Sequence, residues 1–233
     1  MTDLPQLATN IHACRRCPRL VAWCQHVART KRAAFRDETY WGQPITGFGD
    51  PAARLLLVGL APAAHGANRT GRVFTGDRSG DFLFAALHRT GFANQAKSQH
   101  RDDGLRLNLA YVTAIVRCAP PANQPTSIER AACSPWLEAE LQLLSEVRVV
   151  LALGGEAWRH LFRLYRDHGE DVPRPVVPFG HGTEVKIGQH TMIGSYHPSQ
   201  QNTFTGRLTA LMLDDVIFRG RQLAGLARFE LES

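Results

Sequence analysis

Residues 55–77, LLLVGLAPAAHGANRTGRVFTGD, constrain the fold more than any other part of this chain of 233 residues. The first four, Leu55–Val58, are all apolar, which is typical of a strand that helices cover on both faces. A long loop follows, and its glycines allow backbone N–H groups to come close to a ligand. Open α/β sheets bind ligands beyond the carboxyl ends of their strands, and unusually long loops are often functional. We therefore predict an α/β fold with a ligand site in this loop.

The order of apolar strand, loop and helix recurs along the chain. After the first strand, the pattern predicts strands at 109–116, 147–153 and 184–195. It predicts helices at 81–89, 128–145 and 207–228, and one more that follows the strand 147–153 and ends at residue 165. Ser127 has the side chain of an N-cap for the helix that follows it. Residues 3–30 have a helical pattern, whereas 31–53 and 166–184 have no clear period. Four strand-to-helix units predict one domain, residues 1–233, with a central, mainly parallel, four-stranded sheet and helices on both faces.

Charge and hydropathy limit the partners of the chain. Lys and Arg outnumber Asp and Glu by 27 to 21, which gives a formal net charge of +6. A positive balance suits a polyanionic partner such as nucleic acid. No apolar run approaches the roughly 20 residues that cross a bilayer, and the N-terminus MTDLPQLATN has no signal-peptide pattern. We expect a cytoplasmic protein that does not enter a membrane.

Four of the five cysteines suggest one metal site. Cys14 and Cys17 form a CxxC pair just before a proline, and Cys118 and Cys133 follow much later in the chain. In a cytoplasmic protein such cysteines are read as metal, cluster or catalytic residues before disulfides. Four thiolates suit either a structural Zn²⁺ or an iron–sulfur cluster, and the spacing does not decide between them. Cys24 falls on the apolar face of a helical pattern and is expected in the core.

Polar and aromatic residues near the predicted strand ends are the candidates for chemistry, because parallel strands end at one edge of the sheet. His197, held by Pro198, could donate a hydrogen bond to an oxygen that gains charge. Asp77 could orient a water or stabilise a cation, or it could simply cap the next helix. Asn123 could read the edge of a nucleobase, or form an Asx turn. Phe74 could stack on a planar ligand, or pack in the core.

At these residues the sequence resembles the family 5 uracil-DNA glycosylases, also called type b. The resemblance rests on GLAPAAHGANRTGRVFTGD at 59–77, on HPSQQN at 197–202 and on the four cysteines. It implies a uracil-DNA glycosylase-like, three-layer α/β/α sandwich. It also implies a 4Fe-4S iron–sulfur cluster on Cys14, Cys17, Cys118 and Cys133, which would tie the N-terminal segment 1–53 to the core. The implied activity is DNA repair: uracil, and other deaminated or damaged bases, would be flipped out of DNA and released by hydrolysis of the N-glycosidic bond.

The same resemblance implies roles for residues of the long loop. Three residues match the family's first motif and are expected to contact the flipped nucleobase: Gly59, Ala61 and Pro62. Related families have a polar or acidic residue at the position of Leu60, so a water-activating side chain is missing there. Asp77 is the candidate to replace it, with Asn68 of the same loop as the alternative.

The resemblance also implies which residues hold the base. Phe74 matches the aromatic residue that stacks on the flipped base, and His197 matches the residue that hydrogen-bonds uracil O2. Related families place an asparagine at the end of the second strand, where this chain has Ala114. Asn123 is then the remaining candidate to read the base, and acceptance of bases besides uracil is expected.

Partners and competing functions follow from the same motifs. The residues expected to enter the DNA groove are Gln200, Gln201 and Asn202. We expect double-stranded DNA as partner, with single-stranded DNA as a second form, and a monomer at work on the nucleoid of a bacterial or archaeal cell. One alternative is a non-catalytic nucleic-acid-binding module with an Fe–S cluster or zinc. Another is an enzyme acting on a small nucleotide, although the chain has neither a P-loop of the GxxxxGK type nor an evident GxGxxG fingerprint.

Overall fold

The fold is built on a six-stranded sheet with the order β1-β3-β2-β4-β6-β5. The computed structural model describes residues 3–227 and 229. The strands are β1 (Phe48–Gly49), β2 (Leu55–Gly59), β3 (Ala110–Ala114), β4 (Val149–Leu153), β5 (Glu184–Ile187) and β6 (His190–Ser195). The four inner strands are parallel to one another, and the two edge strands are antiparallel to their neighbours. The carboxyl ends of β2, β3, β4 and β6 therefore lie along one edge.

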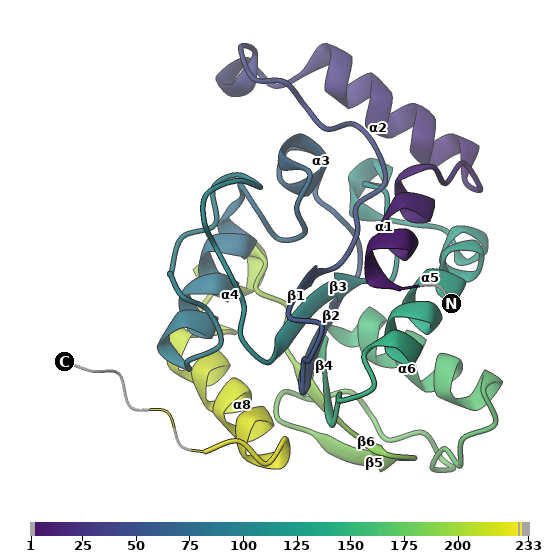
Figure 1. The fold of residues 1–233 in the computed structure, drawn as a ribbon, viewed down its shortest axis with the longest axis vertical. Helices are drawn as coiled ribbons and strands as arrows, with labels where there is room; N and C mark the ends of the chain where they lie inside the picture. Colours follow the sequence, from purple (N-terminus) through teal and green to yellow (C-terminus); the bar gives the residue numbers. More distant parts are fainter. Residues whose placement is uncertain (1–2, 228, 230–233) are drawn as a thin grey trace.

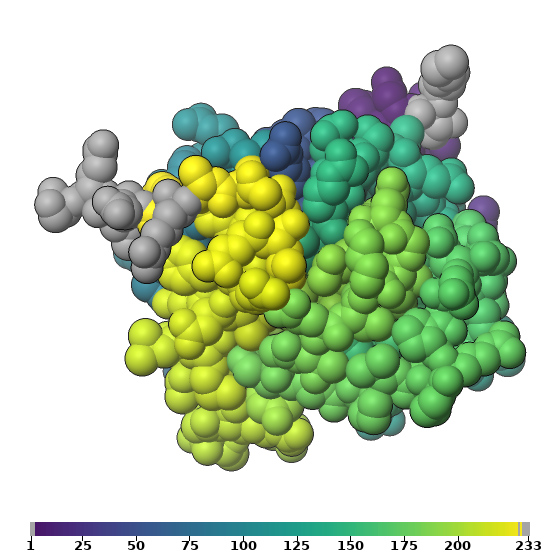
Figure 2. All heavy atoms as spheres, turned by 90° about the horizontal axis from the view of Figure 1, so that it is seen from below, coloured from purple at the N-terminus to yellow at the C-terminus, as the bar shows by residue number. Residues whose placement is uncertain are grey.

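Helices cover both faces of the sheet, as expected (Figure 1). They are α1 (Leu4–His12), α2 (Pro18–Thr30), α3 (Ala67–Thr70), α4 (Arg78–Arg89), α5 (Ser127–Leu143), α6 (Gly155–Asp167), α7 (Gln200–Phe204) and α8 (Ala210–Leu223), with short 3₁₀ turns at Ala33–Phe35 and Pro121–Asn123. Helices α4 and α8 pack together on one face, whereas α5, with α1 beside it, and α6 lie on the other. Helices α2 and α3 lie near the edge where the parallel strands end. Figure 2, seen from below after a 90° turn, shows a surface formed mostly by the second half of the chain.

The core follows from the sequence of the inner strands. In β2 every residue is buried, with Leu56 and Val58 packed toward α5 and α6, and Leu55 and Leu57 packed toward α4 and α8. Alternate residues of a strand point to opposite faces, so a continuous apolar run serves two cores at once. This confirms the three-layer α/β/α arrangement. None of the helices in the described part of the chain has the length and apolar character of a membrane-spanning segment.

The strand count differs from the predicted four. The four predicted strands supply the four parallel inner strands, but residues 184–195 form two strands, β5 and β6, instead of one. Gly188, with φ of +53°, makes the reversal, a conformation that glycine adopts without the steric penalty of other residues. The second added strand, β1, lies within residues 31–53, where no clear period was visible.

Two helix starts also differ from the prediction. Thr126, and not Ser127, caps α5: its hydroxyl accepts from the Glu129 N–H, and the Glu129 carboxylate accepts from the Thr126 N–H, so that the two form a capping box. Helix α4 begins at Arg78, directly after its cap Asp77. The short helix α7 within the segment after His197 was not predicted.

Candidate active site

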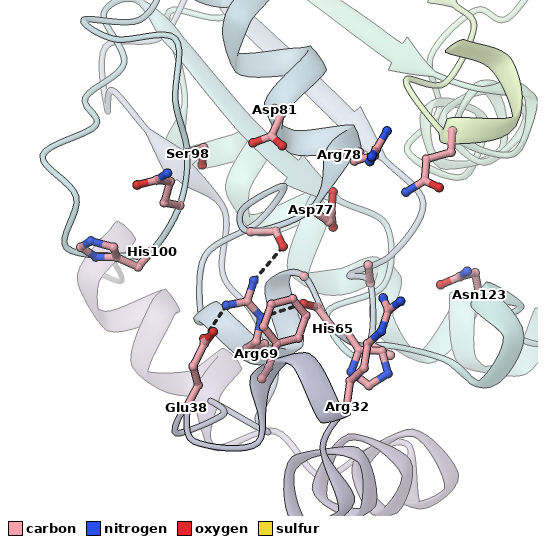
Figure 3. Close-up of a pocket in the computed structure, with 17 residues that line it drawn as sticks. Arg32, Glu38, His65, Arg69, Asp77, Arg78, Asp81, Ser98, His100 and Asn123 are labelled. Atoms are coloured by element: carbon pink, nitrogen blue, oxygen red, sulfur yellow. Dashed lines mark hydrogen bonds and ion pairs between the residues drawn. The ribbon is translucent and has the colours of Figure 1, made fainter. Parts of the chain in front are cut away.

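Two adjoining cavities open where the parallel strands end. The smaller one, called here the inner pocket, has a volume of about 270 Å³. It is lined by Leu60, Ala61, Pro62, Ala63, Val73, Phe74, Asp77, Ser79, Asn123, His197 and Ser199. The larger one, called here the outer cavity, has about 790 Å³, and its charged and polar lining includes Arg32, Glu38, His65, Arg69, Arg78, Asp81, His100 and Gln200 (Figure 3). Ala63, Asp77 and Asn123 line both cavities.

Phe74 and His197 form the aromatic part of the inner pocket. Their ring centroids lie 5.9 Å apart, with the ring planes tilted by 34°. Phe74 has a φ of +50°, a strained conformation for a bulky side chain, and strain of this kind is found mainly at functional sites. A Cβ added at Gly59 would lie 2.7 Å from the Phe74 ring. The absence of a side chain at the end of β2 therefore creates the space in which this ring lies.

His197 lies just after the carboxyl end of β6. Burial in the pocket lowers the pKa of His197 to about 4, so the imidazole is neutral at physiological pH. The Nδ2 of Asn202 donates a 2.9 Å hydrogen bond to the His197 carbonyl oxygen. This contact supports the turn that carries the imidazole. The Asn202 amide, which was expected to contact DNA, makes this hydrogen bond within the protein.

Asp77 combines the two roles that the sequence left open. Its Oδ1 accepts from the Gly80 N–H at 3.0 Å and so caps α4, while the side chain also lines both cavities. A Cβ added at Gly66 would lie 2.0 Å from Oδ2 of this carboxylate, so the loop closes tightly around it. Burial raises the pKa of Asp77, although the N–H groups of Gly80 and Ser79 partly oppose the shift. A carboxylate at a pocket wall with a raised pKa is a typical functional group.

Two arginines hold the loop that carries Phe74 and Asp77. Arg69 donates to the His65 carbonyl at 2.9 Å and to the Gly76 carbonyl at 2.7 Å, and its guanidinium pairs with Glu38 (Figure 3). Arg72 is buried and binds Asp103 through both terminal nitrogens, at 2.8 and 2.7 Å. Bidentate pairs of this kind fix geometry as well as charge. These two arginines were visible in the sequence only as charges within the loop, and their structural role was missed.

Asn68, the alternative to Asp77 as the water-activating group, lines neither of the two cavities. Its side chain is fully buried, and Nδ2 donates to the carbonyls of Cys24 and Ala64 at 3.3 and 3.4 Å. The residue thus connects α3 to α2. Sequence alone did not reveal this, because a polar side chain in a glycine-rich loop gives no sign of its burial. Of the two candidates for the water-activating group, only Asp77 lies at the pocket.

The other predicted residues fall into two groups. Ala61 and Pro62 line the inner pocket, as does Asn123, which is exposed and has a φ of +56° within a short 3₁₀ turn after β3. Gln200 lines the outer cavity, and Gln201 is exposed on the same helix, α7. Sequence reasoning missed further lining residues, among them Ser79, Ser199, Arg32, His65 and Arg78. Their proximity in sequence to Asp77 and His197 was a usable signal only for Ser79, Arg78 and Ser199.

The four predicted cysteine ligands meet at a separate small cavity of about 10 Å³. Cys14 and Cys17 come from the connection between α1 and α2, Cys118 from the segment after β3, and Cys133 from α5. Among residues 3–227 and 229, no group of three or more His, Cys, Asp or Glu side chains is arranged closely enough to hold a metal ion. Four thiols from three segments line one cavity nevertheless, and thiolates are the ligands that an iron–sulfur cluster or zinc requires, so the residue types fit such a group.

The fifth cysteine does not line this cavity, although its thiol neighbours that of Cys118. Cys24 is 1% exposed in the core, and its Sγ lies 3.5 Å from the Ala119 carbonyl oxygen. This burial agrees with its predicted place on the apolar face of a helix.

Comparison with known proteins gives one consistent result. The family model of the uracil DNA glycosylase superfamily matches residues 46–217. The chain is 55% identical to a type-5 uracil-DNA glycosylase of Mycobacterium bovis, over 95% of this chain and 82% of that protein. It is 54% identical to a type-5 uracil-DNA glycosylase of Mycobacterium leprae, over 96% of this chain and 97% of that protein. It is 50% identical to one of Thermus thermophilus, over 96% of this chain and 100% of that protein. With the inner pocket at the strand ends and this similarity over nearly its whole length, the chain belongs to the type-5 group of the uracil-DNA glycosylase superfamily.

Proposed function

We propose that this protein is a monofunctional uracil-DNA glycosylase, which flips uracil out of DNA and hydrolyses the N-glycosidic bond to leave an abasic site. The observation that carries the proposal is that Phe74, Asp77 and His197 line a single pocket of about 270 Å³. That volume is near the lower end of the roughly 300 to 1,000 Å³ typical of small-molecule pockets and suits a single base. A base within a duplex cannot reach such a pocket unless it leaves the stack.

The base would be held by Phe74 and His197. A flipped pyrimidine stacks on the Phe74 ring, with its edge toward His197. The low pKa of His197 keeps the imidazole neutral, so it acts as a hydrogen-bond donor to uracil O2 and not as a cation. Negative charge builds on this oxygen as the base leaves, and one such donor typically contributes about 2.7 to 4 kcal/mol to a barrier. Asn123 lines the same pocket, and its amide, with a donor and an acceptor, would contact a second edge of the base.

Asp77 would act on the sugar side. The bond between C1′ and the base nitrogen breaks with its electron pair going to the base, which leaves cationic character on the sugar. A water oxygen then bonds to C1′, and the proton that this water loses neutralises the departed base anion. A carboxylate at the wall of the pocket both attracts the cation and orients this water. Asp77 fits this role because one oxygen is held by the Gly80 N–H while the side chain still reaches the cavities.

The outer cavity would take the DNA around the flipped nucleotide. Arg32 and Arg78 contribute positive charge there, and Gln200 extends the lining onto α7. The net charge of +6 favours binding to phosphates. We propose double-stranded DNA as the main substrate, single-stranded DNA as a second form, other deaminated bases as further substrates, and a monomer as the working unit.

Cys14, Cys17, Cys118 and Cys133 would hold a 4Fe-4S cluster. Such a group supplies a covalent connection between the N-terminal segment 1–53 and the core, since its ligands come from both, and the whole chain would then act as one domain. Iron and acid-labile sulfide content of the purified protein tests this, with visible absorbance as a second readout. We expect Cys17→Ser to lose iron and Cys24→Ser to retain it. Zinc without sulfide in the purified protein would contradict the cluster.

Incubation with a uracil-containing duplex, followed by alkaline cleavage of abasic sites, tests the activity. We expect strand cleavage only at uracil. Tight binding without cleavage would favour a non-catalytic nucleic-acid-binding module instead. Reaction with a free nucleotide and none with DNA would favour an enzyme on small nucleotides.

A further inference from the structure

Phe204 is an aromatic side chain at the rim of the proposed DNA site that the proposed reaction does not use. It is 67% exposed at the end of α7, the short helix that follows His197. The Arg78 guanidinium lies 5.2 Å from the centroid of the Phe204 ring. Arg78 directly follows Asp77 and lines the outer cavity, and Figure 3 shows it reaching toward the yellow-green helix α7. Phe204 therefore lies beside the mouth through which a nucleotide would enter.

Three other side chains of this segment, those of Asn202, Thr203 and Thr205, bond back to the protein, whereas Gln200 and Gln201 are exposed. The Asn202 amide bonds to the His197 carbonyl, and the Thr203 hydroxyl donates to the Ser199 carbonyl at 3.2 Å. The Thr205 hydroxyl donates to the Gln201 carbonyl at 2.7 Å. Phe204, by contrast, directs a large apolar surface into solvent, where its only aromatic or cationic contact in the described part of the chain is Arg78.

We infer that Phe204 inserts into the base stack of duplex DNA and fills the space that the flipped nucleotide leaves. The inference rests on the proposed function, and it gives Phe204, and not Gln200 or Gln201, the task of holding the gap. Inserted apolar side chains are a common means of unstacking DNA, and bases stack well on aromatic rings. Arg78 stabilises the ring by its cation–π contact and adds positive charge for the adjoining phosphate. Phe204 is thus a positioning residue and makes no contact with the reacting atoms.

The test compares two uracil substrates in single-turnover reactions. In one, uracil is paired within a duplex; in the other, the same uracil lies in an unpaired bubble, where no stack has to be broken. We expect Phe204→Ala to slow release from the paired duplex about tenfold or more, the size of one lost base–aromatic stack. Release from the bubble should stay within about twofold of the wild-type rate. Phe204→Trp should restore most of the rate on the paired duplex.

A fluorescence measurement gives a readout that a general loss of structure would not produce. With 2-aminopurine next to the uracil, binding of the wild-type protein should first raise the 2-aminopurine fluorescence, because this base loses the uracil as its stacking partner. Insertion of the Phe204 ring beside it should then partly quench that fluorescence. Phe204→Ala should give the rise without the quench. Leu211→Ala is the matched control, since Leu211 is 74% exposed on α8 and away from both cavities, and it should behave as wild type.

The possible outcomes separate this inference from the proposed function. If wild-type protein releases no uracil from either substrate, the proposed function fails, and with it the inference. If wild-type protein is active and Phe204→Ala slows both substrates equally, or neither, Phe204 does not fill the gap and the glycosylase proposal stands without it.

Discussion

The Asp77 carboxylate lies against the backbone of Gly66, so closely that a Cβ at position 66 would meet Oδ2 at 2.0 Å. Backbone of the long loop, and not another side chain, thus sets where this carboxylate can be. A glycine is needed here for space, because any side-chain carbon at position 66 would collide with this carboxylate.

Gly66→Ala should therefore displace Asp77 and lower uracil release without a comparable loss of DNA affinity. We expect a decrease in the single-turnover rate of about tenfold or more, since the carboxylate would lose its position relative to the sugar. Gly155→Ala at the start of α6 is the control, because a Cβ there meets its nearest neighbours at 3.3 to 3.6 Å. An unchanged rate for Gly66→Ala, with a folded protein, would mean that the position of Asp77 does not matter for the reaction.

The pH dependence of uracil release should report Asp77. Burial raises its pKa above the ordinary 3.8, and the proposed role requires the ionised form, so the rate should decrease toward acid with a midpoint above 3.8. Asp77→Asn should be slow, and any acid limb that it retains should have its midpoint near 4, where His197 itself gains a proton. No further inflection is expected near 6.5, because His197 stays neutral down to a pH of about 4. The proposal for Asp77 fails if Asp77→Asn retains the acid limb of the wild type with an unchanged midpoint.

Phe74 offers a separate test, because its backbone is strained while its ring is proposed to stack on the base. Both Phe74→Ala and Phe74→Gly should reduce uracil release by about tenfold or more, since both lose the ring. With φ near +50°, however, glycine avoids a steric cost of about 1 kcal/mol that alanine retains. Urea unfolding should show the glycine variant to be the more stable of the two, which is the reverse of the order at ordinary positions. Equal or inverted stabilities would show that this residue is not strained.

Acid should destabilise the fold through buried neutral histidines. His160 and His190 are 5% and 7% exposed, and burial lowers the pKa of each from 6.5 to about 4. Between these values the unfolded chain binds protons that the folded chain does not, so the free energy of unfolding should decrease as pH falls from 6.5 to 4. The loss approaches about 3 kcal/mol for each histidine.

Urea unfolding at a series of pH values measures this slope. His190→Gln should reduce the slope, whereas His26→Gln, which alters an exposed histidine of α2, should not. The same slope in all three proteins would rule out the contribution of His190.

The parallel sheet was predictable because its strands carry unbroken apolar runs. Leu55–Val58 needs burial on both faces, and only a sheet between two helical layers provides this. The turn within 184–195 was not predicted because β5 and β6 both mix apolar and polar residues, so that together they look like one continuous strand. The only sequence sign of the reversal was Gly188. The two-residue strand β1 is too short to have a recognisable period.

The site was predictable where motif residues lie in the loops that follow the parallel strands. Phe74, Asp77, Asn123 and His197 all line the inner pocket, because strands β2, β3 and β6 end at the same edge. What the sequence did not reveal was which polar residues of the loop are structural. Asn68, Arg69 and Arg72 make their contacts with segments distant in the chain, and no local pattern records such contacts.

Single-turnover release of uracil from duplex DNA by the wild-type protein and by His197→Ala tests the central claim most directly. The neutral imidazole beside the Phe74 ring is proposed to stabilise the departing base, so its loss should reduce the rate by about 100-fold or more. His168→Ala, at an exposed histidine after α6, should retain the wild-type rate. Release by His197→Ala at the wild-type rate would contradict the account, because the pocket would then not be where the glycosidic bond is broken.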